Sequence, residues 1–589
     1  MSIKNDEIAR IFSEIGDYLE MQGVAFKPRA YQRAAVVIAG LTEEAADIYK
    51  KGGLRALEEI PGVGASIAEK IEELIKTGRL GYYQNLKNKV PVKLSELRAV
   101  EGLGPRHIKF LYQKLGIKNL QDLEEAAEQG KIRKLVGFGT KSEEKILKSI
   151  QFLKKSGGRF LLNEVLTQAR EIEERLKRLP GVGKTAIAGS LRRRKETIGD
   201  IDILVTVSTK SATNKVADFF ASMPEVVTIF AKGPTKSMVK LKSSLDADLR
   251  VVPEKSYGAA LSYFTGSKEH NVCLRELAIK KSWKLNEYGL FAVGGRGKTE
   301  RWLAGRTEEE IYQKLGLVYI EPELREMTGE IEAAQADQLP KLIGYNDLRG
   351  DLQVQTNWSD GQHSIEAMGR AAAALGLEYI LITDHSQRLA MAHGLDEKRV
   401  LEQLKEIDRV NDRFKKAGIK LVILKGSECD ILKDGRMDLP DQLLAKLDIV
   451  GGSIHSHFKL SRSEQTERLV RAMTNPQVDI IFHPTGRLIN RREPYDLDID
   501  RVIEVAKATG TVLEVNAFPD RLDLKDEHIR RCVAAGVKLV VSSDSHSTNH
   551  FSVLEYGLAQ ARRGWAEKSN VINAWPLEKM KSMIKHGRR

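Results

Sequence analysis

The segment that most constrains this chain runs from Gly189 to Asp202 and reads GSLRRRKETIGDID. Two aspartates, Asp200 and Asp202, stand two positions apart where this segment enters the apolar stretch IDILVTV. Because alternate side chains of a β-strand lie on one face, we expect both carboxylates to project together while Ile201 and Ile203 face the other way. Adjacent carboxylates repel unless cations lie between them, and Mg²⁺ is typically held by one or two carboxylates plus substrate phosphates. A lone Asp-x-Asp pair is more often a solvated strand end, so the metal interpretation needs a further carboxylate.

A third carboxylate follows at Asp248, in the sequence DLRVVP. We expect Asp248 to open a second short strand, with Arg250 on the same face and Val251 on the opposite one. If the two strands pair, three carboxylates converge on one point. That convergence favours a divalent metal site over a solvated strand end.

The next informative segment is YFTGSKEHNVCLRELA, in which Tyr263 and Phe264 precede a Thr-Gly turn and an amphipathic helix. Aromatic faces suit a base or a sugar, and Gly266 permits close approach of the backbone. The helix carries Asn271 and Arg275, which add polar groups to the same region. The segment predicts contacts with a nucleotide.

Together these three segments resemble the palm and thumb of the family X DNA polymerases, the polymerase-beta-like nucleotidyltransferases, and the resemblance extends over roughly residues 1–327. It implies a two-ion Mg²⁺ site in which Asp200, Asp202 and Asp248 are the metal ligands, with Asp248 accepting the proton of the primer 3′-hydroxyl. The implied substrates are dNTPs and gapped or nicked DNA. The implied nucleotide-binding residues are Gly189, Ser190 and Arg193 as the triphosphate clamp, Tyr263, Phe264 and Gly266 beside the incoming sugar, Asn271 and Arg275 at the minor groove, and Gly199.

The N-terminal third repeats one pattern three times, as IPGVGASIAEKI from Ile60, VEGLGPRHIKFL from Val100 and LVGFGTKSEEKI from Leu135. Each copy predicts a Gly-x-Gly hairpin that leads into an amphipathic helix. Backbone N–H groups at such a helix N-terminus bind anions, and helix-hairpin-helix units use them to hold DNA phosphates without reading bases. A single Gly-x-Gly is often an ordinary helix end, but three of like spacing favour DNA binding. The expected phosphate-binding glycines are Gly62, Gly64, Gly102, Gly104, Gly137 and Gly139.

Lys70, in ASIAEKIEELI, resembles the lysine that forms a Schiff base with an abasic-site sugar in the lyase domain of this family. Lys27 and Tyr31 match that domain as well. Phe26 stands where the animal enzymes carry a histidine, and Ser66 replaces a DNA-contacting lysine. A solvated helix lysine explains Lys70 equally well, so lyase activity and a surface role both stay open.

The second half has a different pattern. From about residue 346, apolar runs alternate with helical stretches, and most runs end in a metal-type ligand: YILITDHS, LVILKGSECD, DIVGGSIHSH, DIIFHPTGR, TVLEVNA and LVVSSDSHS. Alternating strands and helices predict a parallel sheet, and side chains collected at the C-terminal strand ends are typical of an α/β-barrel active site.

These runs resemble a PHP (polymerase and histidinol phosphatase) domain, a distorted seven-stranded barrel with a three-metal phosphoesterase centre that bacterial and archaeal family X enzymes carry. The implied Mn²⁺ or Zn²⁺ ligands are Asp360, His385, Glu428, His455, His483, Asp544 and His546. The usual opening H-x-H is replaced by Gln353 and Gln355, whose neutral oxygens bind divalent transition metals more weakly than imidazole. We therefore expect 3′-5′ exonuclease or abasic-site endonuclease activity that these glutamines weaken.

Two alternatives stay open for the barrel. It could be a catalytically degenerate module that positions DNA, or the chain could be a metal phosphatase acting on small molecules whose N-terminal half binds nucleic acid. The aspartate triad and the Tyr-Phe-Thr-Gly segment oppose the phosphatase alternative. We therefore interpret the chain as a DNA-directed DNA polymerase that fills short gaps in base-excision repair.

Composition agrees with this interpretation. A formal net charge of +13 suits a polyanionic partner, although it would equally suit a membrane surface, and the motifs decide for DNA. Cys273, Cys429 and Cys532 are far apart, so neither a disulfide framework nor a zinc finger is indicated. Because no long apolar run occurs, we expect a cytoplasmic protein that does not bind membranes. We also expect a monomer.

The expected fold class is multidomain, with a helical helix-hairpin-helix region, an α/β nucleotidyltransferase palm and thumb, and a C-terminal distorted (β/α)7 PHP barrel. The expected boundaries are 1–80 for the lyase-like domain, 81–155 for the fingers-like domain, 156–255 for the palm, 256–327 for the thumb, 328–345 for a linker and 346–589 for the PHP domain.

Overall fold

The computed structural model describes the chain except residues 1, 2, 4, 25, 40, 42, 61, 99, 101, 102, 156, 157, 294–299 and 585–589. The chain forms two compact units, which are described separately. The first comprises Met1–Gly158 with Leu488–Pro494 and Ser547–Phe551. The second comprises Arg159–Arg487, Tyr495–His546 and Ser552–Arg589.

The first unit is helical, and its helices enclose an apolar core that includes Phe12, Ile15, Ile71 and Leu111. Glycines end two of its helices in left-handed conformation, Gly78 after α4 and Gly116 after α7. The helices are α1 (Asn5–Met21), α2 (Lys27–Ala39), α3 (Ala45–Glu58), α4 (Ala65–Thr77), α5 (Gly81–Lys89), α6 (Leu94–Arg98), α7 (Pro105–Leu115), α8 (Leu120–Glu128), the 3-10 helix η1 (Ile132–Lys134) and α9 (Thr140–Lys155).

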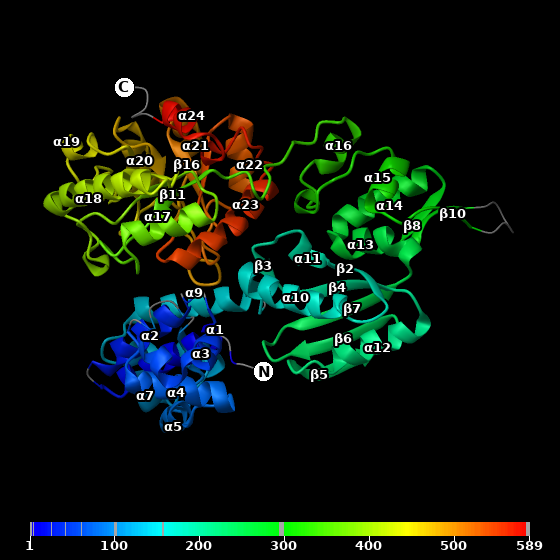
Figure 1. Ribbon diagram of the computed structural model, residues 1–589, viewed down its shortest axis with the longest axis horizontal. Coiled ribbons are helices and arrows are strands. Elements are labelled where there is room, and N and C mark those ends of the chain that lie inside the picture. The colour runs from blue at the N-terminus through cyan, green and yellow to red at the C-terminus, as the bar shows by residue number, and fades with distance from the viewer. Residues whose placement is uncertain are drawn as a thin grey trace. The chain divides into compact units, whose positions relative to one another are not determined.

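The second unit begins with a sheet that presents the first candidate site (Figure 1). Its strand order is β2 (Val182–Ile187), β4 (Asp200–Val207), β7 (Asp246–Val252), β6 (Lys236–Leu241) and β5 (Val226–Lys232). The central strands β4 and β7 are parallel and the other pairs are antiparallel. Helices α10 (Leu162–Lys177) and α12 (Lys210–Ala221) pack on this sheet. Strand β7 begins at Asp246, two residues before the expected start at Asp248.

A second group of elements follows this sheet. It comprises α13 (Tyr257–Thr265), α14 (Lys268–Lys280), β8 (Trp283–Asn286), β9 (Gly289–Ala292), β10 (Arg301–Ala304) and α15 (Glu308–Leu315). The segment 328–345, expected as a linker, contains helix α16 (Glu330–Gln335), and Ile331 and Ala334 pack into the core of this group. The buried Glu330 also accepts a hydrogen bond from the buried His270 at 2.8 Å, which the polar composition of the segment did not predict.

The rest of the second unit is a parallel sheet with the strands in chain order. In the described residues these strands are β11 (Gly350–Val354), β12 (Tyr379–Ile382), β13 (Val422–Asp430), β14 (Ile449–Ser453), β15 (Ile480–Ile481), β16 (Val512–Asn516) and β17 (Leu539–Ser542). A parallel bridge between Val354 and Ser545 brings the first and last strands together, so the expected seven-stranded barrel is confirmed and nearly closed.

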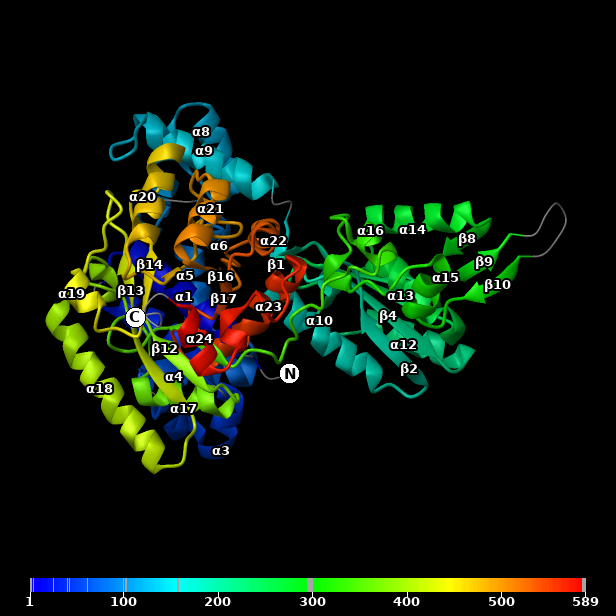
Figure 2. The same ribbon diagram turned by 90° about the horizontal axis from the view of Figure 1, so that it is seen from above.

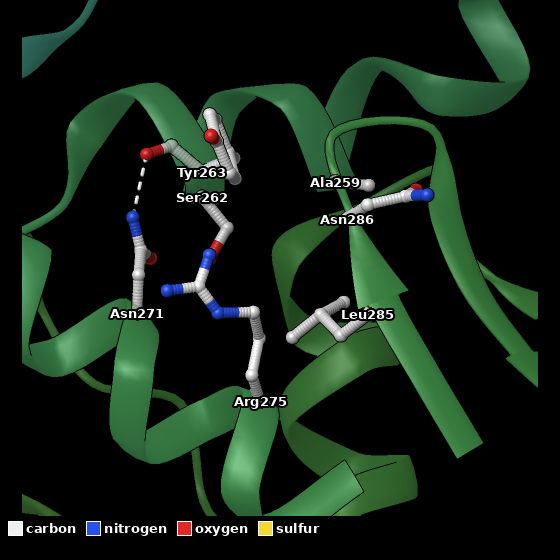
Figure 3. A pocket seen from close by; sticks show the side chains of 7 residues that line it. All are labelled: Ala259, Ser262, Tyr263, Asn271, Arg275, Leu285 and Asn286. Atoms are coloured by element: carbon white, nitrogen blue, oxygen red, sulfur yellow. Dashed lines mark hydrogen bonds between the residues drawn. The ribbon is translucent and has the colours of Figure 1, made fainter. Parts of the chain in front are cut away.

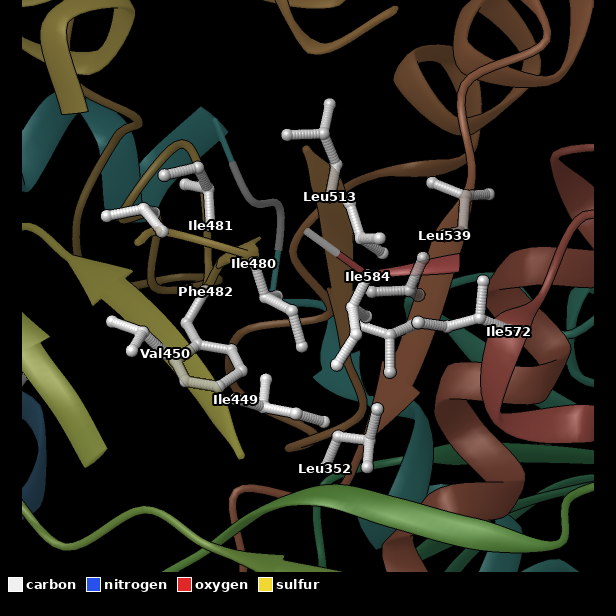
Figure 4. Close-up of a cluster of buried hydrophobic side chains, with 14 of the residues drawn as sticks. Leu352, Ile449, Val450, Ile480, Ile481, Phe482, Leu513, Leu539, Ile572 and Ile584 are labelled. Atoms are coloured by element: carbon white, nitrogen blue, oxygen red, sulfur yellow. The ribbon is translucent and has the colours of Figure 1, made fainter. Parts of the chain in front are cut away.

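Helices enclose this barrel, as Figure 2 shows from above. They are α17 (Ile365–Ala374), α18 (Glu397–Lys416), α19 (Asp441–Leu444), α20 (Arg462–Thr474), α21 (Ile499–Thr509), α22 (Asp526–Ala535), α23 (Leu554–Arg563) and α24 (Leu577–Met583). Strands covered on both faces read as continuous apolar runs, which explains YILI and LVVS. Figure 4 shows Leu352, Ile480 and Leu513 in the resulting core.

The remaining short elements are β1 (Phe160–Leu161), α11 (Gly189–Arg192), β3 (Thr197–Ile198), η2 (Glu254–Ser256), η3 (Pro322–Leu324), η4 (Ala390–Ala392), η5 (Thr548–Val553) and η6 (Ile572–Ala574). None of the described helices combines the length and the apolar character needed to cross a bilayer.

Candidate active sites

The carboxylates of the first site meet through the pairing of β4 with β7. In that parallel pair Asp202 lies opposite Asp248, and Asp200 lies opposite Asp246. The alternate residue Ile201 is buried on the other face, as the strand periodicity predicts. Asp200 is exposed, whereas Asp202 and Asp248 are half-buried. Sequence reasoning missed the fourth carboxylate, Asp246, although its spacing from Asp248 repeats the Asp-x-Asp pattern of β4.

The electrostatics of this cluster favour a cation. Burial and the neighbouring Asp200 and Asp248 carboxylates raise the pKa of Asp202 to about 7. Burial also raises the pKa of Asp248, although Arg250 opposes it from 3.7 Å. Clustered carboxylates resist ionisation in this way until positive charge is supplied, so the residues fit a divalent metal site.

The loop before β4 needs glycine at its first position. Gly189 has φ +64°, and a Cβ there would lie 2.2 Å from Asp202 Oδ2. A side chain at this position would displace the carboxylate. Ser190 follows on α11. Gly199 lies directly before Asp200, and a Cβ at Gly199 would be 3.2 Å from Arg159 Nη1.

Arg193, at the end of the same loop, is held through two nitrogens of its guanidinium group. Its Nε donates to Glu326 Oε1 at 2.9 Å, and its Nη1 donates to the backbone carbonyl of Thr265. Gly266 lies beside it with φ +73°, and a Cβ there would be 3.1 Å from Arg193 Nη1. The structure therefore brings Arg193 and the Thr-Gly turn together.

A pocket between α13, α14 and β8 gathers the aromatic and polar residues (Figure 3). Its lining residues are Ala259, Ser262, Tyr263, Asn271, Arg275, Leu285 and Asn286. The Asn271 side-chain amide donates to the carbonyl of Tyr263 at 2.7 Å. The rings of Tyr263 and Phe264 meet edge to face at 5.2 Å, and the Arg250 guanidinium lies 4.9 Å from the Phe264 ring. No local signal in the sequence pointed to Leu285 or Asn286.

Phe264 and Arg250 thereby link this pocket to the carboxylates, because Arg250 lies on the strand that carries Asp248. The expected nucleotide-binding residues and the three aspartates occur in one unit of the structure.

The three hairpins of the first unit share one turn geometry. In each, the backbone N–H after the first glycine donates to the carbonyl three residues earlier: Val63 to Ile60 at 2.9 Å, Leu103 to Val100 at 3.1 Å and Phe138 to Leu135 at 3.0 Å. Gly64 and Gly104 are the N-terminal caps of α4 and α7, with nearly identical backbone angles. Gly102 lies outside the described residues.

The first glycine of the outer two hairpins is in the left-handed region, with φ +83° at Gly62 and +86° at Gly137. Gly139 directly precedes α9. The repeated spacing in the sequence therefore corresponds to a repeated turn that places backbone N–H groups at helix N-termini, where phosphates bind favourably.

Lys70 lies on α4 beside two aromatic rings. Its ammonium group donates to the carbonyl of Ser66 at 2.8 Å and to the Ser66 hydroxyl at 3.0 Å. The same group is 5.1 Å from the centre of the Tyr82 ring, which stacks on Tyr31. Lys27 begins α2 and is exposed, as is Phe26. Tyr82 was not predicted, because nothing in its local sequence distinguishes it from a core aromatic.

A second cluster of candidate ligands lies in the barrel and surrounds the buried Glu428. Three imidazoles approach its carboxylate: His483 Nε2 at 2.9 Å, His455 Nε2 at 3.3 Å and His385 Nδ1 at 3.4 Å. These residues follow or end different strands, so the barrel itself brings them together. Ser453 also donates to Glu428 at 2.6 Å.

The remaining expected ligands adjoin His385. Asp360 lies 3.7 Å from His385 Nε2 and 3.6 Å from His546 Nε2, and Asp544 lies 3.9 Å from His546 Nδ1. Two triads have ligand atoms within 4.8 Å of one another in the described part of the chain, and both include His385: Asp360, His385 and His546, and His385, Glu428 and His455.

This cluster also favours positive charge. Burial opposes protonation of His455, but hydrogen bonds to Asp430 and Glu428 outweigh it and raise its pKa to about 9. Burial likewise opposes protonation of His546, and Asp360 and Asp544 raise its pKa to about 9. A donor set of imidazoles and carboxylates that attracts positive charge fits transition-metal ions.

Gln353 and Gln355 are both fully buried beside this cluster. Gln355 Nε2 donates to Glu428 Oε2 at 2.8 Å, so its amide occupies one oxygen of the central carboxylate. Asn516 Nδ2 lies 3.2 Å from both Gln353 Oε1 and Asp544 Oδ2. Among the described residues, Gln355 Oε1 and His483 Nδ1 are buried without a hydrogen-bond partner.

Sequence reasoning also missed Arg521, whose Nε lies 3.6 Å from Asp544 Oδ2. It comes from the segment after β16, where nothing in the local sequence marked it. The buried polar atoms that lack partners are what a site for ions or ordered water requires.

Comparison with known proteins identifies the kinds of domain in this chain. Family models match as helix-hairpin-helix domain over residues 3–80, SAM-like helix-hairpin-helix tandem over 94–151, DNA polymerase beta palm over 161–251, DNA polymerase beta thumb over 260–326 and PHP domain over 351–517.

Among curated proteins, the DNA polymerase/3′-5′ exonuclease PolX of Bacillus subtilis (strain 168) is 38% identical over 582 residues, which is 98% of this chain and 99% of that protein. A probable phosphatase of Caldanaerobacter subterraneus subsp. tengcongensis is 34% identical over 219 residues, covering 35% of this chain and 80% of the relative. A probable phosphatase of Acetivibrio thermocellus is 31% identical over 191 residues, covering 31% and 73%. Because the first similarity extends over nearly both whole chains, this protein belongs to the family X DNA polymerases that carry a PHP domain.

Proposed function

We propose that this DNA polymerase extends primers at short gaps or nicks in DNA, as base-excision repair requires, and that it acts as a monomer. The observation that carries the proposal is the register of β4 and β7, which sets Asp202 opposite Asp248 beside the Gly189 loop. In this proposal Asp200, Asp202 and Asp248 hold two Mg²⁺ ions. Such ions neutralise developing charge and orient the triphosphate in two-metal nucleotidyl transfer.

The side chains of the site have separate roles in this proposal. Asp248 accepts the proton of the primer 3′-hydroxyl, and Arg193 and Ser190 bind the triphosphate. Tyr263 and Phe264 stand beside the sugar and disfavour a 2′-hydroxyl. Asn271 and Arg275 read the minor groove, and the Asn271 bond to the Tyr263 carbonyl keeps the two groups in register.

Single-nucleotide insertion on gapped DNA tests the polymerase site. Asp248→Ala should lower the insertion rate at least a thousandfold while DNA affinity stays nearly unchanged, since the hairpins that hold phosphate belong to the other unit. Asp218→Asn is the matched control, because it neutralises an exposed carboxylate that lies outside the aspartate cluster and pairs with Lys232. Insertion at the wild-type rate in Asp248→Ala would refute the assignment.

For the barrel, we propose a Mn²⁺- or Zn²⁺-dependent 3′-5′ exonuclease or abasic-site endonuclease. Bound metals of this kind activate water for attack on a phosphodiester. The two triads that share His385 would hold them, and the relatives named as probable phosphatases support phosphoester hydrolysis in this domain. Gln353 and Gln355 stand where the first H-x-H ligand pair is usual. Because glutamine is a weaker ligand than histidine, these two residues are expected to reduce metal affinity.

One observation favours a second candidate, a barrel that positions DNA without hydrolysing it. The Gln355 amide bonds to an oxygen of Glu428 that an ion would use. Metal content measured by mass spectrometry, beside a nuclease assay with Mn²⁺, separates the two. His455→Ala should lower both metal content and nuclease activity while primer extension continues; a wild-type protein free of metal and inert on DNA ends would leave the positioning role.

A further inference from the structure

The loop that carries Arg193 is held by a residue from near the C-terminus. Arg563, the last residue of α23, donates from Nη1 to the backbone carbonyl of Arg193 at 2.9 Å and to Glu326 Oε1 at 3.1 Å. Its Nη2 donates to Asp526 on α22. The Arg563 side chain is only 3% exposed. One buried guanidinium thus joins the barrel to the polymerase loop.

Glu326 is the carboxylate that the two arginines share. It accepts from Arg193 Nε at 2.9 Å, and Lys195 Nζ lies 3.6 Å from its other oxygen. Arg193 Nη1 is bound to the Thr265 carbonyl, but no hydrogen bond to Arg193 Nη2 occurs in the part of the chain that the structure describes. Two of the three Arg193 guanidinium nitrogens, Nε and Nη1, are therefore engaged, while the Nη2 donors are left for an anion.

A neighbouring arginine offers a direct comparison. Arg562 is also largely buried on α23, and it donates to Glu323 at 2.8 Å and to the Ile343 carbonyl at 2.8 Å. Neither of these hydrogen bonds involves the 189–193 loop. Arg562 joins the barrel to the segment after α15, whereas Arg563 bonds both to the Arg193 backbone and to the carboxylate that orients the Arg193 side chain.

We propose that Arg563 is a positioning residue for nucleotide binding by the polymerase site. It fixes Glu326 and the Arg193 carbonyl together, so that the Arg193 guanidinium is oriented toward the triphosphate before the nucleotide arrives. Bidentate recognition of phosphate depends on such orientation, and an arginine that is already aligned loses less freedom on binding. The inference rests on the proposed role of Arg193 in binding the triphosphate.

Steady-state insertion of one nucleotide on gapped DNA, with the full chain, measures the effect. Arg563→Lys keeps the charge, but its single nitrogen cannot replace both Nη1, which bonds to Arg193 and Glu326, and Nη2, which bonds to Asp526. We expect the KM for dNTP to rise about tenfold while kcat changes less than about threefold, the signature of lost substrate binding. Arg562→Lys is the matched control, and it should lower thermal stability comparably while leaving the KM for dNTP within about twofold.

A double-mutant cycle shows whether Arg563 acts through Arg193. Arg193→Ala should raise the KM for dNTP more than Arg563→Lys does, and the double variant should match Arg193→Ala alone. Glu326→Gln removes the charge of the carboxylate that Arg193 and Arg563 share, and it should also raise the KM for dNTP. The test therefore does not depend on folding of the Arg563 variant.

The outcomes distinguish the proposed triphosphate clamp at Arg193 from the proposed positioning role of Arg563. If Arg193→Ala leaves the KM unchanged, the proposed triphosphate clamp is wrong. If Arg193→Ala raises the KM but neither Arg563→Lys nor Glu326→Gln does, the clamp stands and the positioning role of Arg563 is overturned. An equal rise in Arg562→Lys would also overturn it, because the effect would then come from general packing of α23.

Discussion

Glu308 lies between two arginines, and replacing it with glutamine is expected to loosen the thumb. The carboxylate, 4% exposed, bonds to Arg192 Nη2 at 2.6 Å and Arg325 Nη1 at 2.6 Å. The Arg325 side chain is fully buried, and Arg192 belongs to the loop that carries the proposed triphosphate clamp. Glu308→Gln keeps the shape of the side chain but leaves two guanidinium groups facing each other without a charge between them.

The free-energy cost of replacing Glu308 follows from the pKa of its carboxyl group. Burial alone would raise it, but the Arg325 and Arg192 guanidiniums outweigh burial and lower the pKa of Glu308 from 4.5 to about 2. A shift of that size corresponds to about 3 kcal/mol at neutral pH, at about 1.4 kcal/mol per unit. Breaking a buried ion pair by removing one partner typically costs about 3–5 kcal/mol, so the two estimates agree.

The pH dependence has a definite sign. Because the folded-state pKa is below the unfolded value, the contribution of Glu308 is fully present above about pH 5 and is lost as the pH falls from 4.5 toward 2. At pH 3.5 the wild type should have lost about 1.4 kcal/mol of the stabilisation from Glu308, because at that pH the carboxyl is largely protonated only in the unfolded chain. Glu308→Gln has no carboxyl to titrate and should lack this component.

Hydrogen exchange read by mass spectrometry on peptides from α15 measures the effect locally. At pH 7 we expect Glu308→Gln to speed exchange of α15 amides about a hundredfold, which is about 3 kcal/mol of opening free energy. Glu309→Gln, at the exposed neighbouring position, is the control. Exchange in Glu308→Gln within threefold of the control, or a difference from wild type that does not shrink between pH 7 and pH 3.5, would refute the reasoning.

Three further outcomes are expected. Gly189→Ala should slow primer extension at least a hundredfold with DNA binding retained in a mobility-shift assay, because its Cβ would lie 2.2 Å from the Asp202 carboxylate; a rate within threefold of wild type contradicts this clash. Gln355→His should raise Mn²⁺ content and exonuclease rate, because imidazole is the better ligand, and an unchanged metal content would show that the glutamine is not limiting. Borohydride trapping on an incised abasic site should fail in Lys70→Ala and persist in Lys76→Ala on the same helix; trapping in both would assign the Schiff base to another group.

Local patterns in the sequence predicted the elements of both sites. The period of two in IDILVTV predicted that Asp200 and Asp202 share a face, and the structure confirms that Ile201 is buried on the other. The repeated Gly-x-Gly spacing predicted a repeated hairpin, and Val63 and Leu103 make the same turn hydrogen bond. Alternating apolar runs and helices predicted the parallel barrel. Each inference depends on periodicity or on turn chemistry, which act over a few residues.

The polar segment 328–345 shows that local patterns do not predict every element. Its composition predicted a linker, yet α16 lies within it because Glu330 pairs with His270 in the core. The partner stands 60 residues away, so no window of local sequence contains both groups. Burial of a charged residue is decided by its partner, and the partner is known only once the chain has folded.

The order of residues along the chain was enough to predict which chemical groups this protein carries: a carboxylate pair on a strand, glycine hairpins suited to phosphate, and candidate ligands at the ends of barrel strands. How these groups are combined became known only from the folded chain. It set Asp202 opposite Asp248, gathered three histidines around Glu428, and placed Arg563 against Arg193 across 370 residues. Contacts of this kind depend on how many side chains pack at once, and the short-range spacing of residues does not encode that packing.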